Sequence, residues 1–114
     1  MGGGHQLGDN FQDIINKWVK NHPNSVVIPV HKINIWTKGE LYAVQTYVWV
    51  MDGIDNLNIE LVRNGACNSN TMLLTDEKSD LLISNSQYKL FENKILEAEK
   101  YAQSNKLGIW KEKL

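Results

Sequence analysis

The sequence is poor in cysteine and arginine, and it contains no long hydrophobic run. Cys67 is the single cysteine among 114 residues, which excludes an internal disulfide and a cysteine-rich zinc site. Arg63 is the single arginine, so one chain cannot supply two bidentate guanidinium clamps. No apolar stretch approaches the roughly 18 to 20 residues that a membrane span needs.

An excess of charge of one sign is also missing. Twelve basic residues stand against thirteen acidic ones, for a net charge of -1. This balance excludes a strongly basic nucleic-acid arm and a polybasic membrane anchor. The chain is 42% hydrophobic and 22% charged, a composition typical of a domain that buries a core.

Residues 1–9 are expected to form a flexible N-terminal segment or a truncation scar, and residues 10–114 a single domain. The first eight residues, MGGGHQLG, lack the charged and apolar regions of a signal peptide. A lone histidine at such a terminus, His5, is expected to be disordered rather than a ligand. The compartment stays open.

Hydrophobic periodicity predicts a first helix that begins near Phe11 and ends before Pro23, with Asp9 as its N-cap. Two β-rich strands follow, Ser25–Trp36 and Glu40–Met51, separated by a turn. Pro29 lacks a backbone donor, so its part of the strand is expected to be an edge or a bulge.

The second half predicts a short helix, an extended segment, a polar loop and a long helix. Gly65 provides the C-terminal cap of the short helix. The expected order is α-β-β-α-β-α, an α+β fold, with these bounds for the second half: Leu57–Asn64, Ala66–Leu74, Thr75–Asp80 and Asn85–Asn105.

The inventory of reactive groups is short. Histidines are scattered, and no spacing typical of a zinc site occurs. Asp52 and Asp55 flank a turn without the rest of a calcium loop. We expect Cys67 to be a buried small hydrophobe rather than a nucleophile. No metal ligand or cofactor is predicted.

Tyr47 and Trp49 share one face of the second strand and could stack on nucleic-acid bases. The same alternation makes one strand face core, so burial is the competing interpretation. Because the flanking charge is not basic, any nucleic-acid binding is expected to be weak.

Four segments together resemble the staphylococcal nuclease-like (thermonuclease) family. They are a strand ending in an Asp-Gly turn, an "ELVRNG" helix end, an "AEKYA" helix core and an "LGIW" ending. Their order and spacing match the family over about residues 10–110. The matching positions are Tyr47–Gly53, Glu60–Gly65, Ala98–Ala102 and Leu107–Trp110.

The resemblance implies the second half of an oligonucleotide-binding (OB-fold) barrel without its first three strands. In the family, those strands carry the calcium-binding carboxylates and the first catalytic arginine. Val44 stands where the second catalytic arginine is expected, so no catalytic residue carries over. Calcium would be a cofactor only if this chain belonged to a longer protein that is an active nuclease. A structural role is expected for Arg63, Gly65, Glu99 and Trp110, with a glutamate of the last helix as the partner of Arg63.

Three functions remain open on this basis. The first is a degenerate nuclease-like domain without phosphodiesterase activity that acts in binding or assembly. The second is part of a calcium-dependent nuclease of DNA or RNA whose first half lies elsewhere. The third is a structural domain with no nucleic-acid role. Three strands cannot close a barrel, so either another chain supplies the missing strands, or the chain dimerises edge to edge, or the helices cover the gap. Of these, self-association through open sheet edges is the hypothesis we carry forward.

Overall fold

The computed structural model describes residues 6–73 and 79–111. The expectations for residues 1–5, including His5, and for most of the loop at 75–80 therefore lie outside the described residues. The fold is α+β, as predicted. Its elements are α1 (Phe11–Asn21), β1 (Val26–Thr37), β2 (Glu40–Asp52), β3 (Asp55–Asn56), α2 (Leu57–Arg63), α3 (Ser69–Met72), β4 (Asp80–Leu81), α4 (Asn85–Ser104) and the 3₁₀ turn η1 (Gly108–Trp110).

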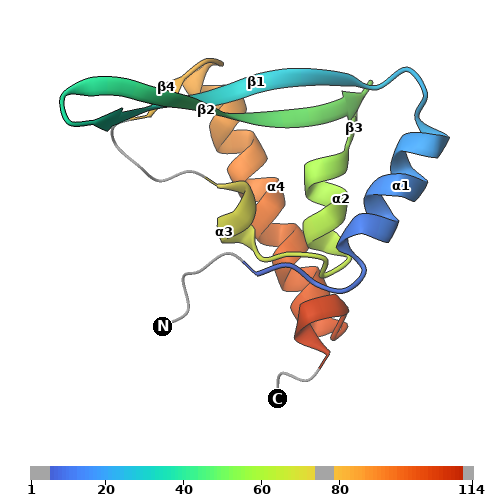
Figure 1. Cartoon of the computed structure of the whole chain (residues 1–114). Coiled ribbons are helices and arrows are strands. Elements are labelled where there is room, and N and C mark those ends of the chain that lie inside the picture. The colour runs from blue at the N-terminus through green and yellow to red at the C-terminus, as the bar shows by residue number, and fades with distance from the viewer. Residues whose placement is uncertain (1–5, 74–78, 112–114) are drawn as a thin grey trace.

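An open antiparallel sheet in the order β3-β2-β1-β4 lies across the helices (Figure 1). The long hairpin β1–β2 forms most of it, because β3 and β4 contain two residues each. The register slips between Pro29 and His31, where β1 carries an extra residue. The prediction for the strand around Pro29 is an edge or a bulge, because proline has no N–H to donate, and the slip confirms the bulge.

The core lies where α2 and α4 meet beneath one end of the hairpin. Val62 and Ile95 are fully buried there, and Trp18 of α1 joins the same cluster. The ring of Trp49 lies 4.5 Å from that of Phe91, centroid to centroid, which fastens β2 to α4. These contacts follow the apolar stripes predicted for the helices.

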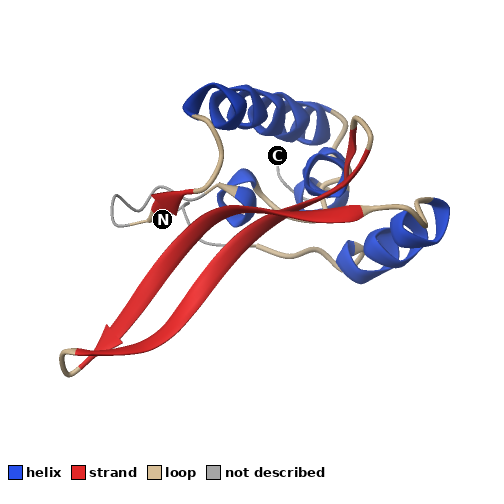
Figure 2. Ribbon diagram, turned by 90° about the horizontal axis from the view of Figure 1, so that it is seen from above, coloured by secondary structure: helices blue, strands red, loops and turns tan. Residues whose placement is uncertain are grey.

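The other end of the hairpin leaves this core. Figure 2 shows the two strands projecting past the helices to a turn at Lys38 and Gly39. The radius of gyration is 15.1 Å, whereas a compact domain of this length has about 13 Å. We call residues 33–46 the outer hairpin.

Two local predictions are wrong. The segment Ala66–Leu74 is not extended throughout, because Asn68 caps the short helix α3 by accepting hydrogen bonds from the N–H and hydroxyl of Thr71, at 3.3 and 2.7 Å. Asp9 is not the N-cap of α1. That position belongs to Asn10, whose side chain makes no capping bond and instead donates to the carbonyl of Asn64, 3.3 Å away. Nine elements lie in the described residues, three more than the predicted six, because β3, α3 and η1 are added. The short strand β4 begins at Asp80, where a loop is predicted, and does not lie in Ala66–Leu74.

Candidate functional site

The side chain of Asn58 closes part of the outward edge of β2. The Val50 N–H donates to Asn58 Oδ1 at 3.0 Å, and Asn58 Nδ2 donates to the Val48 carbonyl at 2.9 Å. An amide placed in this way imitates a neighbouring strand. It is held there by α2, whose first turn is capped by Asn56 through the N–H of Ile59, at 3.1 Å.

The hydrogen bonds to Asn58 also fix the direction of the backbone in the rest of β2. Backbone groups of alternate strand residues point to the same edge, so those of Val44 and Thr46 point outward as well. Within the described part of the chain, nothing bonds to them. Beyond them, Tyr42 is skipped in the register, since Ile35 pairs with Ala43 and Trp36 with Leu41.

We call the stretch Ala43–Tyr47 the free β2 edge. Asn58 bounds it on one side and the bulge at Tyr42 on the other. It contains no charged residue, proline or glycine. Gln45 at its centre is exposed, and so are Val44 and Thr46.

The opposite edge of the hairpin is covered differently. β4 pairs with β1 at His31 and Lys32, and the Leu82 N–H donates to the Val30 carbonyl at 2.8 Å. The part of β1 beyond β4 lies between two lysines, Lys32 and Lys38. Lysines on a strand edge hinder further pairing, because an approaching strand would have to desolvate them.

Large apolar side chains are exposed on the outer hairpin. Tyr42 is 76% exposed and Trp36 60%, and Leu41 and Val44 are also largely in contact with solvent. A two-stranded ribbon with so little burial has only marginal stability by itself. Among the described residues, the outer hairpin is therefore an exposed apolar surface next to a backbone edge without a hydrogen-bond partner.

Tyr47 and Trp49, the two residues predicted to stack on bases, are both half-buried at the root of the hairpin. Trp49 packs against the core through Phe91. Base stacking by these rings stays a prediction, and the structure adds a packing role for Trp49.

The four residues expected to be structural lie around the ends of α2 and α4. Gly65 has φ +69°, and a Cβ there would overlap the carbonyl oxygen of Leu107. The Ile109 N–H donates to the Gly65 carbonyl at 2.8 Å. Trp110 ends the same η1 turn and is half-buried. A glycine is thus required where the C-terminal turn crosses the end of α2.

Arg63 and Glu99 are not partners. The Arg63 guanidinium carbon lies 3.7 Å from the ring centroid of Tyr101, a cation–π contact. Glu99 accepts a hydrogen bond from the backbone N–H of Ser69 at 2.7 Å. Among the described residues, Arg63 forms no ion pair with a glutamate, so the predicted partner is wrong.

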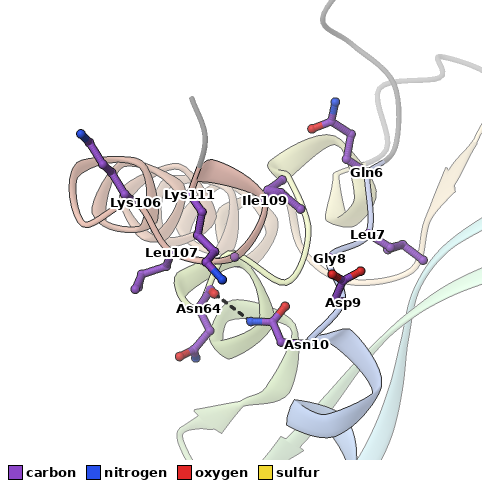
Figure 3. A pocket seen from close by; sticks show the side chains of 11 residues that line it. Gln6, Leu7, Gly8, Asp9, Asn10, Asn64, Lys106, Leu107, Ile109 and Lys111 are labelled. Atoms are coloured by element: carbon purple, nitrogen blue, oxygen red, sulfur yellow. Dashed lines mark hydrogen bonds between the residues drawn. The ribbon is translucent and has the colours of Figure 1, made fainter. Parts of the chain in front are cut away.

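An open cavity of about 880 Å³ lies beside this crossing (Figure 3). The cavity is lined by residues 6–10, Asn64, residues 106–109 and Lys111. Figure 3 shows the hydrogen bond that joins two of the lining residues, from the Asn10 side chain to the Asn64 carbonyl. Asp9 and two lysines are its ionisable side chains, a set without a recognisable acid–base pair or nucleophile.

His22, which follows α1, joins that helix to Asp55 at the start of β3, a contact that sequence reasoning missed. Its ring stacks on Trp18 at 3.8 Å. Nδ1 lies 2.8 Å from the Trp18 carbonyl, and Nε2 lies 3.2 Å from Asp55 Oδ2. The backbone carbonyl, followed by Asp55, raises the pKa of His22 above its usual value. No local signal links two residues 33 positions apart.

His31 has the opposite environment. It is 7% exposed, with Ser79 3.2 Å from Nδ1 and Tyr88 packed edge-on. Burial lowers the pKa of His31. Nε2 has no hydrogen-bond partner in the described part of the chain, so a proton there would be buried without an acceptor.

Cys67 is buried, as predicted. Burial, with a smaller contribution from Glu99, raises the pKa of the thiol to about 12. A thiolate nucleophile is therefore absent at neutral pH. Within residues 6–73 and 79–111, no three His, Cys, Asp or Glu side chains gather in a way that could hold a metal ion.

No family model matches the chain, and searches of curated proteins and of solved structures also find no match. None of the helices in the described ranges combines the length and apolarity needed to cross a bilayer.

Proposed function

We propose that the chain is a non-catalytic assembly module related to the second half of a staphylococcal nuclease-like domain. The observation that carries the proposal is the outer hairpin. It combines exposed Trp36 and Tyr42 with the unpaired backbone of the free β2 edge. A surface of this kind suits strand addition, in which main-chain hydrogen bonds supply affinity.

Phosphodiester hydrolysis has different requirements. A cation must be held by carboxylates, and donors must converge on the phosphate oxygens. The chain offers one arginine, and its guanidinium lies on Tyr101. Val44, at the place where the resemblance puts the second catalytic arginine, lies on the free β2 edge.

The test is incubation of the chain with fluorescently labelled single-stranded DNA and RNA, with calcium and with chelator. We expect no calcium-dependent cleavage. Cleavage that co-elutes with the protein through successive columns would contradict the proposal. The same strands report binding, which we expect to be weak and to decline further with salt.

A second candidate is half of a calcium-dependent nuclease completed by strands from another chain. The open sheet favours it, because a barrel of this kind needs further strands. Adding a fragment with the family's first three strands would then produce calcium-dependent cleavage. The assembly proposal predicts that such a mixture stays inactive.

A further inference from the structure

We infer that the partner bound by the free β2 edge is a second copy of this chain, paired antiparallel about Gln45. The inference rests on the proposed function and specifies its partner. Strand addition between identical edges yields a closed dimer with two-fold symmetry. Three features of the hairpin favour this arrangement over others.

The first feature is the match of hydrogen-bonding groups. With Gln45 on the two-fold axis, Val44 lies opposite Thr46 of the second copy, and Thr46 lies opposite its Val44. The backbone groups of these two residues point outward and have no partner in the described part of the chain. Each facing pair can therefore exchange both its N–H···O bonds in the usual antiparallel manner.

The second feature is charge. Pairing through the free β2 edge brings no ionisable side chain opposite another, because Ala43–Tyr47 is uncharged. Pairing through β1 about Ile35 would place Lys32 of one copy opposite Lys38 of the other. Like charges directly opposite destabilise a strand pair, so the β2 edge is the favoured one.

The third feature is that the edge is closed at both ends. Asn58 occupies the backbone groups of Val48 and Val50, at 2.9 and 3.0 Å. The bulge at Tyr42 interrupts the strand on the other side, and bulges oppose edge pairing. A short window between two blocks fixes one register and stops the association at a dimer.

The main experiment measures molar mass by sedimentation equilibrium from about ten to several hundred micromolar, the range in which an interface this short is expected to be weak. Thr46→Pro removes the outward N–H while leaving the β1–β2 ladder intact, since proline is tolerated at a free edge. Thr46→Val keeps the N–H and serves as the matched control. We expect the wild type and Thr46→Val to dimerise, and Thr46→Pro to require at least tenfold higher concentration.

A charge exchange keeps the test independent of any folding defect. Gln45→Lys and Gln45→Glu each place like charges across the two-fold axis, so each alone should be monomeric. An equimolar mixture places opposite charges there and should form a mixed dimer. This rescue is expected only if Gln45 of one chain faces Gln45 of the second copy.

A wild-type mass that stays monomeric to several hundred micromolar overturns the inference. Equal masses for Thr46→Pro and Thr46→Val, or no rescue in the mixture, overturn the register. These outcomes are distinct from calcium-dependent cleavage, which contradicts the proposed function itself.

Discussion

The two ends of the β1–β2 hairpin differ in what supports them. At its root, Trp49 packs on Phe91, and the edge of β2 is bonded by Asn58. At its outer end, Tyr42 is 76% exposed, and the outward backbone groups of Val44 bond to nothing in residues 6–73 and 79–111. One continuous strand thus passes from a core position to an unsupported one within seven residues, from Trp49 to Tyr42.

The difference shows that β-rich sequence alone does not define a core. Both ends are apolar and aromatic, and only the helices decide which part is buried. Stability is expected to reside at the root, and association at the outer end. Substitutions at the two ends should therefore separate the two properties.

The largest expected effect is at the root. Ile95→Ala removes a fully buried side chain beneath the hairpin, and such truncations reduce the free energy of unfolding by about 2–5 kcal/mol. Tyr42→Ala at the outer end should change it by less than about 0.5 kcal/mol in the monomer. Urea unfolding at low protein concentration measures both, and equal losses would contradict the comparison.

The next effect concerns the crossing of the C-terminal turn over α2. Gly65 and Gly53 both have positive φ, at +69° and +61°. An alanine at Gly53 meets no atom within 4 Å, whereas one at Gly65 overlaps the Leu107 carbonyl. Gly65→Ala should destabilise by about 1–3 kcal/mol more than Gly53→Ala. Similar melting temperatures for the two variants would show that the crossing is not tightly packed.

His31, at the base of the outer hairpin, should make the free energy of unfolding depend on pH. Burial lowers its pKa, so the unfolded chain takes up a proton that the folded chain resists. Stability should therefore fall as pH drops through 6.5, the ordinary pKa of histidine. His31→Phe should remove part of this acid-side loss, as seen in the free energy of unfolding at pH 7.5 and 5.5. An unchanged slope would argue against a neutral buried imidazole.

His22 should act with the opposite sign and a smaller amplitude. Its pKa is raised by the Trp18 carbonyl and then by Asp55. The stabilisation from protonated His22 is complete below the pKa of His22 in the unfolded chain. It is lost as pH rises through the higher pKa of the folded chain. His22→Gln should thus lower stability more at acid pH than at pH 8. A penalty that grows toward alkaline pH would reverse the assignment.

The sequence predicts the long elements and the α+β class well, because periodicity and β-branched runs are local signals. The bulge at Pro29 and the cap at Gly65 are predictable for the same reason. The short helix α3 was missed although Asn68 is a typical cap, since four residues show no periodicity. The strand mimicry of Asn58 and the stacking of Arg63 on Tyr101 depend on tertiary contacts, which no local pattern encodes.

The family resemblance stays a prediction, and so does base stacking by Tyr47 and Trp49. The open sheet is compatible with half of an OB-fold barrel. The sequence predicts open sheet edges, and in the described residues the unpaired part of the β2 edge is the stretch Ala43–Tyr47. This uncharged stretch is the one that we propose to pair with the same stretch of a second copy.

The most direct test of the account is amide hydrogen exchange of the chain at about 10 and several hundred micromolar. The account predicts slow exchange in α4 at both concentrations. It predicts fast exchange at Val44 and Thr46 in the dilute sample and protection of these two amides in the concentrated one. Exchange at Val44 and Thr46 that is equally fast at both concentrations would contradict it.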